Sequence, residues 1–281
     1  MGLRNNSQHV EDLEKAVALL TAVPVIIKLS NAVGSTLEVG MKKLPAKAQA
    51  GIAEATRIGL NKSIALAGST LESKKQKAWT TSHMVAAATS GAVGGFFGLS
   101  GLLIEIPVTT TLMMRSILDI ARSEGHDIQD LRIQFECLDV FRIGSRQTTG
   151  DDGAETGYYA GRAAVAEVIR EAAKQVGAEG AKGAARGISS TLVGDALAKL
   201  IEAVAARFGV VITQKAALQA APFVGALTGA TVNSLFMDYY QDTARGHFIV
   251  LRLSKEYGAD VVQQEFDAIR TVLAAKQGVA A

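Results

Sequence analysis

The chain has 281 residues, of which 48% are hydrophobic and 20% are charged, and its formal net charge is +2. This length and apolar content are sufficient for a substantial core, so the chain as a whole is not expected to be disordered. A net charge this small gives no indication of nucleic-acid binding. Cys137 is the only cysteine, which excludes an intrachain disulfide and a zinc site built from cysteines.

Helical patterns begin near the N-terminus. Apolar residues at helical spacing over residues 11–28 predict an amphipathic helix that is interrupted at Pro24. Pro45 is expected in the first turn of a second helix, which continues over residues 46–71. The short polar break that follows, residues 72–77, is either a solvated turn or a contact with acidic lipid. Its basic residues are Lys74, Lys75 and Lys77.

Residues 84–104 form a run of 21 residues without a charge. A helix of roughly 20 apolar residues can cross a bilayer core, but only nine of these residues are large and apolar, so the driving force for insertion is weak. A buried core helix and a membrane-inserted hairpin both remain open. A second uncharged run covers residues 216–237. Both runs carry glycines at four-residue spacing, which lets another helix approach closely; the predicted helix-packing residues are Gly91, Gly94, Gly95, Gly98, Gly225, Gly229 and Asn233.

The polar residues that end the first run are the main candidate site. Residues 83–122 are predicted to form two helices that meet at Pro107. On a helix, Thr109, Ser116, Asp119 and Ser123 fall on one stripe, with Arg115 and Arg122 along its edge. Glu105 joins that side if the chain passes the proline without a large kink.

Two interpretations of this stripe remain open. Arg115 and Asp119 are four residues apart and can pair, so the charges can be a structural network that fixes helix crossing, which we favour. Alternatively, the stripe binds an anion through Thr109, Thr110, Arg115 and Ser116. In an enzyme the catalytic residues would be Glu105, Arg115 and Asp119, with Glu105 as the base and Arg115 as the anion clamp.

The second half of the chain continues in the same way. Residues 128–143 predict a helix in which Cys137 belongs to the core, and residues 145–157 are the best loop and a candidate hinge. The run 210–213 is strand-like but too short to support a sheet. No zinc-protease, serine-hydrolase or phosphate-loop motif occurs, so we expect no metal and no cofactor. The pattern predicts an all-α, single multi-helix bundle with two central glycine-rich apolar helices and no substantial β-sheet.

Three stretches of this chain resemble the EcsC family. They are GGFFGLSGLLIEIPVTTTLMMRSILDIARSEGHDI, FECLDVFRIG and PFVGALTGATVNSLFMDYYQDTARGHFIVLRLSKEYG. The resemblance covers roughly residues 45–258 and is most specific around Glu105, Pro107 and Arg115. It implies an EcsC-like helical domain over 45–258, preceded by a helical extension (1–44) and followed by an amphipathic helix (259–281).

The resemblance also implies a function at a membrane. Family members are regarded as helical, cytoplasmic or membrane-associated proteins connected with transport, secretion or lipid surfaces. The leading hypothesis is therefore a non-catalytic adaptor, located in the cytoplasm at the inner face of the membrane, with anionic lipid and a membrane transporter as partners. The alternatives are a hydrolase-type enzyme acting on a phosphate- or acyl-bearing lipid, and an oligomer that associates through its glycine faces.

Overall fold

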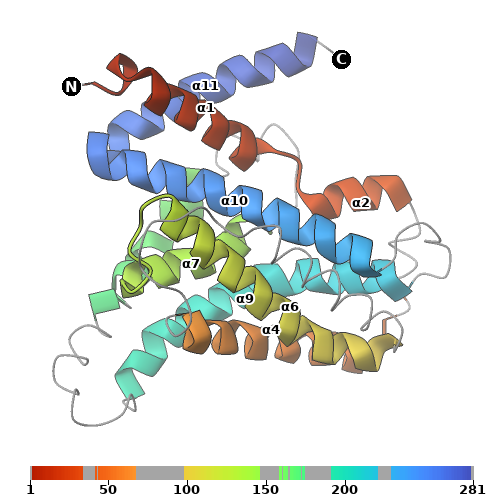
Figure 1. The fold of residues 1–281 in the computed structure, drawn as a ribbon. Helices are drawn as coiled ribbons and strands as arrows, with labels where there is room; N and C mark the ends of the chain where they lie inside the picture. Colours follow the sequence, from red (N-terminus) through yellow and green to blue (C-terminus); the bar gives the residue numbers. More distant parts are fainter. Residues whose placement is uncertain are drawn as a thin grey trace.

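The computed structural model describes residues 2–33, 42, 44–67, 98–145, 191–220 and 229–279, and residues 158–174 except 160, 164 and 172. All regular structure in these residues is helical, and they contain no strand (Figure 1). The predicted all-α fold is confirmed. None of the helices in these ranges is long and apolar enough to cross a bilayer.

The helices of the described ranges follow one another in chain order. After a single 3-10 turn, η1 (Leu3–Asn5), they are α1 (Ser7–Thr21), α2 (Val25–Val33), α4 (Ala46–Ala67), α6 (Gly98–Ser123), α7 (Leu131–Ile143), α9 (Thr191–Ala220), α10 (Gly229–Tyr257) and α11 (Ala259–Val279). The described residues of 158–174, here called the 158–174 segment, are also mostly helical.

Local chemistry explains several of these ends. The side chains of Asn6 and Asp130 accept hydrogen bonds from backbone N–H groups in the first turns of α1 and α7. Gly258 has φ +92°, a left-handed conformation that ends α10 and turns the chain into α11.

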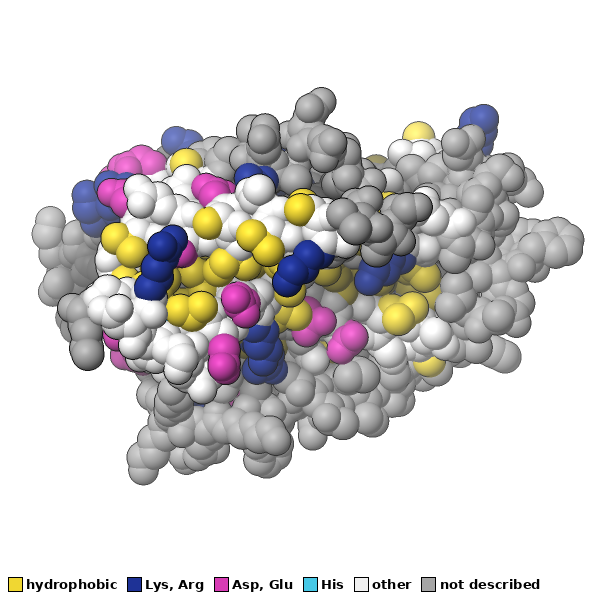
Figure 2. Space-filling model, turned by 90° about the horizontal axis from the view of Figure 1, so that it is seen from above, with side chains coloured by type: hydrophobic (Ala, Val, Ile, Leu, Met, Phe, Trp, Pro, Cys, Tyr) yellow, Lys and Arg dark blue, Asp and Glu magenta, His cyan; other side chains and the backbone are white. Residues whose placement is uncertain are grey.

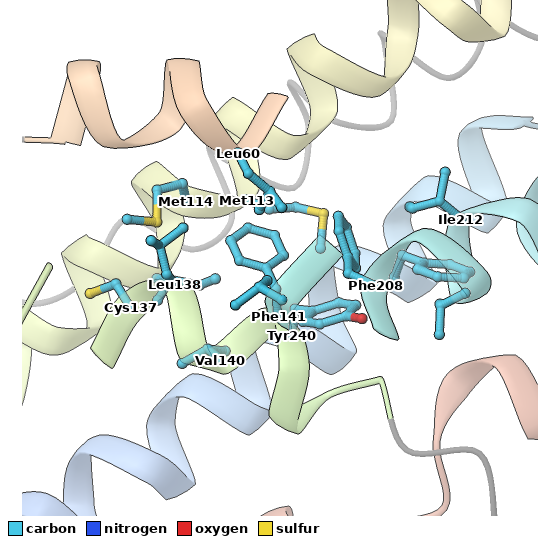
Figure 3. Packing of buried hydrophobic residues seen from close by; sticks show 14 of the residues in the cluster. Leu60, Met113, Met114, Cys137, Leu138, Val140, Phe141, Phe208, Ile212 and Tyr240 are labelled. Carbon is cyan, nitrogen blue, oxygen red and sulfur yellow. The ribbon is translucent and has the colours of Figure 1, made fainter. Parts of the chain in front are cut away.

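α10 runs through the middle of the molecule. Figure 1 shows α1 and α11 on one side of it and α4, α6 and α9 on the other. The main core lies on the second side, where α7, α9 and α10 bring together the rings of Phe141, Phe208 and Tyr240 (Figure 3). The ring centroids are 4.8 Å apart for Phe141 and Phe208 and 5.7 Å apart for Phe208 and Tyr240. This spacing is favourable for aromatic pairs.

The prediction of two helices that meet at Pro107 is wrong, because α6 is continuous through the proline. Proline removes one backbone donor, so the carbonyl of Leu103, four residues earlier, loses its helical partner. Packing against α4 favours continuing the helix. A Cβ on Gly59 of α4 would lie 3.2 Å from the Cα of Pro107 and 3.0 Å from the Cβ of Thr110.

Two other predicted features differ from what the structure shows. The second uncharged run is divided, since residues 216–220 end α9 and residues 229–237 begin α10. The strand-like run 210–213 is helical within α9, where Val211 and Ile212 are buried in the main core; packing here overrides β-propensity. The predicted hinge, apart from Ser145, and most of the first uncharged run lie outside the described residues.

Candidate functional site

The polar face of α6 points into the protein and not toward solvent. Glu105, Thr109, Ser116 and Asp119 are all 5% exposed or less. Charged and polar groups buried to this extent need partners. The arrangement of those partners decides what the site can do chemically.

Glu105 is bound by residues from two other helices. Lys215 Nζ of α9 lies 3.0 Å from Glu105 Oε1, and Asn233 Nδ2 of α10 donates to the same oxygen at 2.8 Å. The ammonium of Lys215 also lies 5.7 Å from the centroid of the Phe236 ring, within range of a cation–π interaction. The other carboxylate oxygen, Oε2, is buried and has no hydrogen-bond partner among the described residues.

Lys215 and Glu105 compensate each other's charge in this buried cluster. Burial lowers the pKa of Lys215, and the carboxylate of Glu105 acts in the opposite direction. Each partner therefore limits the desolvation penalty of the other, although the pair need not be more stable than an apolar substitute. This cluster joins α6, α9 and α10 at one point.

Asp119 is paired, but not with Arg115. Its ion-pair partner is Arg122, three residues further on, and both side chains are almost fully buried. Arg115 is partly exposed and forms no ion pair within the described part of the chain. A buried carboxylate is paired most effectively by the arginine buried beside it, so the predicted Arg115–Asp119 pair does not form. Ser116 accepts a hydrogen bond from Gln241 Nε2 of α10 at 2.9 Å.

A second polar cluster lies between α7, α10 and the 158–174 segment. Arg162 binds both carboxylate oxygens of Glu136, with each N–O distance 3.2 Å. His247 of α10 is fully buried, with Nε2 3.2 Å from Glu136 Oε2 and Nδ1 2.9 Å from the hydroxyl of Tyr158. Next to it, Asp139 and Arg142 of α7 form a two-point ion pair, with an Nη2–Oδ2 distance of 2.8 Å.

The charged groups of this second cluster determine the protonation states of Glu136 and His247. Burial would raise the pKa of Glu136, but the contacts with His247 and Arg162 hold it at about 2. Burial lowers the pKa of His247. The lowered pKa keeps the imidazole neutral near pH 7. Because Arg162 Nη1 can only donate to Nδ1, we assign the proton to Nε2, which lies 3.2 Å from the carboxylate but outside hydrogen-bond geometry, and Nδ1 then accepts from the Tyr158 hydroxyl.

Sequence reasoning missed Lys215, Glu136 and His247. The signal for Lys215 was its position on the apolar stripe of α9, after Val204, Phe208 and Val211, all 1% exposed or less. A charge on such a stripe requires a buried partner, but periodicity does not identify it. The same reasoning applies to His247, which is on the buried face of α10.

The remaining predicted site residues divide into two groups. Thr110 is buried and donates to the carbonyl of Ile106 at 2.7 Å, so its hydroxyl is engaged within α6. Gly98 and Gly229 are the first residues of α6 and α10. The others lie outside the described residues: Lys74, Lys75, Lys77, Gly91, Gly94, Gly95 and Gly225.

The fold and these clusters define an all-α protein in which the buried charges described above are paired, some within one helix and some between helices. A model of the EcsC protein family matches residues 22–253 of the 281, and the chain therefore belongs to this family. No curated protein and no solved structure shows a significant match to it.

Proposed function

We propose that this protein is a non-catalytic accessory protein that binds peripherally to an anionic lipid surface, in connection with transport or secretion. The supporting observation is the outer face of α6. Ile104 and Val108 are 74% and 48% exposed, and the partly exposed Thr111 and Arg115 continue the same face at helical spacing. An apolar stripe that leads to an arginine suits the boundary between acyl chains and headgroup phosphates.

The arrangement of Glu105 favours a structural role for this residue over a catalytic one. Its bound oxygen is occupied by Lys215 and Asn233, and the residue is 4% exposed. Arg115 is ten residues away, which is about 15 Å along a helix axis. One substrate phosphate could not contact both groups directly, so no observation favours the lipid hydrolase in which Glu105 is the base and Arg115 the clamp.

The proposal also includes a basic lipid contact and a protein partner. Lys74, Lys75 and Lys77 would add about 1 kcal/mol each to the attraction of an anionic leaflet. A membrane transporter is the proposed protein partner. A second copy, packed through the glycine faces, is the alternative.

Vesicle co-sedimentation of the full chain tests the lipid proposal. We expect binding to vesicles of phosphatidylcholine mixed with phosphatidylglycerol, weaker binding to phosphatidylcholine alone, and release at high salt. The double variant Ile104→Ser/Val108→Ser should bind at least several-fold more weakly, and Arg115→Gln should reduce the preference for anionic vesicles.

Val272→Ser is the matched control, because Val272 of α11 is 54% exposed but lies outside this stripe. It should bind as the unmodified chain does. Equally poor binding to neutral and anionic vesicles would contradict the proposal. Undiminished binding of the double variant would show that α6 does not carry the interaction.

A further inference from the structure

The terminal helices α1 and α11 lie together on α10, and both are outside the family-matched region, which covers residues 22–253. They share a hydrophobic cluster with the second half of α10, separate from the main core. Figure 2 views this side of the molecule and shows apolar side chains between charged side chains of both signs. α11 therefore covers an apolar surface of the family domain, which includes Tyr158, Ile249 and Leu253.

A chain of contacts leads from α11 to the buried carboxylate of Glu136. Phe266 of α11 stacks on Tyr158, with ring centroids 5.6 Å apart and an interplanar angle of 18°. The hydroxyl of Tyr158 donates to Nδ1 of His247 at 2.9 Å, and the other ring nitrogen of His247 faces Glu136 at 3.2 Å. Tyr158, against which α11 packs through Phe266, is therefore also a direct partner of His247; we call this contact surface the seat of α11.

We propose that protonation of His247 releases α11 from this seat, so that α11 is an acid-released cap. A protonated imidazole carries a hydrogen on Nδ1, so the Tyr158 hydroxyl, which now donates there, must turn and accept instead. It also places a second cation beside Arg162, whose Nη1 is 3.4 Å from Nδ1. The reoriented hydroxyl and the repulsion between the two cations both change the contacts that hold Tyr158, and so weaken its stack with Phe266.

The other charged groups around His247 do not remove this effect. Glu136 attracts the new charge but already binds Arg162, and Asp139 is committed to Arg142. His126, on the α6–α7 connection, adds repulsion when it is protonated. At the far end of α10, His9 of α1 lies 3.6 Å from Glu256 and away from the His247 cluster. Release is therefore expected for α11 and not for α1.

Proton linkage gives the direction in which pH shifts the equilibrium between bound (closed) and released (open) α11. Burial lowers the pKa of His247 in the closed state, and an imidazole that regains water has an ordinary pKa of about 6.5. The open state binds the proton more tightly, so acidification below about 6.5 shifts the equilibrium toward release, by up to roughly tenfold per pH unit for one proton.

Hydrogen exchange of the full chain at pH 7.5 and pH 5.5, corrected for the pH dependence of intrinsic exchange, tests this proposal. Protection of the α11 peptides should fall up to about tenfold at pH 5.5, while that of the α6 peptides should change little. His247→Gln, which cannot be protonated, should make α11 protection the same at both pH values. His126→Gln is the control and should keep the response, because His126 contacts the carbonyl of Phe248 and not Tyr158.

Tyr158→Phe provides a second measurement if His247→Gln does not fold. It keeps the ring on Phe266 but removes a donor that neutral His247 needs, so the midpoint of α11 release should move to higher pH. The proposal is overturned if α11 protection in the unmodified chain does not depend on pH. A response that persists in His247→Gln, or a midpoint that Tyr158→Phe leaves in place, would overturn it equally.

Discussion

Gly144, which follows α7, is a position where adding a single methyl group should destabilise the fold. Its backbone has φ −70° and ψ −11°, which any residue can adopt, so only the surroundings exclude a side chain. An added Cβ would overlap the ring of Tyr240. That ring cannot move easily, because its hydroxyl is 3.0 Å from Ser145 Oγ and its faces pack in the aromatic core.

We therefore predict that Gly144→Ala lowers the free energy of unfolding by about 1–3 kcal/mol, the usual range for overpacking. Gly209→Ala is the matched control, because no atom lies within 4 Å of an added Cβ at this position inside α9. Alanine should stabilise that helix by about 0.5–1 kcal/mol. Urea midpoints measure both changes, and equal midpoints for the two variants would contradict the prediction.

Residue types could be predicted as important, but their partners could not. Glu105 was identified because a carboxylate follows a long uncharged run, and Asn233 because it belongs to a glycine-rich segment. Their contact joins positions 128 residues apart, and Lys215 reaches Glu105 across 110 residues. Local spacing carries no information on such pairs. Only the crossing of α6, α9 and α10 brings them together.

At the scale of the elements, the Glu105–Lys215 pair should couple α6 to α9. Lys215→Met leaves the carboxylate buried without its cation, which typically costs about 3–5 kcal/mol. The double variant Glu105→Leu/Lys215→Met removes both charges and should be more stable than Lys215→Met alone. A double-mutant cycle in urea measures this coupling.

Lys199→Met serves as the control on the same helix, because Lys199 is exposed and should change stability by no more than about 0.5 kcal/mol. Losses for Glu105→Leu and Lys215→Met that simply add in the double variant would show that the charges are not coupled. Glu105 would then be held mainly by Asn233.

Helices were predictable where apolar periodicity and breakers agree, as at Pro24. The errors arose where one local rule was applied without the packing. Pro107 is a helix breaker by its chemistry, yet α6 continues because Gly59 allows α4 to pack closely against it. Val210 to Thr213 are β-formers by composition, yet they lie inside a helix of 30 residues, where Val211 and Ile212 belong to the buried face.

At the scale of the whole molecule, α10 connects the two hydrophobic clusters and contributes to both polar clusters. Asn233 and Gln241 on its first half bind α6, while His247 on its second half faces α7 and the 158–174 segment. Close approach of α1 to α10 depends on Gly246, where an added Cβ would lie 2.8 Å from Leu20 Cγ. A change in protonation at His247 thus acts where the terminal helices meet the family domain.

Global stability should consequently fall in acid in two windows. His247 has a pKa lowered from 6.5, so its contribution is present above that value and is lost as the pH falls through the folded pKa. Glu136 has a pKa lowered from 4.5 to about 2, so its contribution, on the order of 3 kcal/mol, is present above 4.5 and is lost toward pH 2.

Urea unfolding at pH 7, 5.5, 4 and 3 measures both windows. Glu136→Gln strands Arg162 and should be less stable at pH 7, but its stability should depend less on pH between 4.5 and 3, because the carboxylate that takes up the proton is gone. Glu14→Gln, at an exposed position of α1, should follow the unmodified chain throughout. An unmodified chain whose midpoint stays constant from pH 7 to pH 3 would contradict both assignments, because no proton would then be taken up on unfolding.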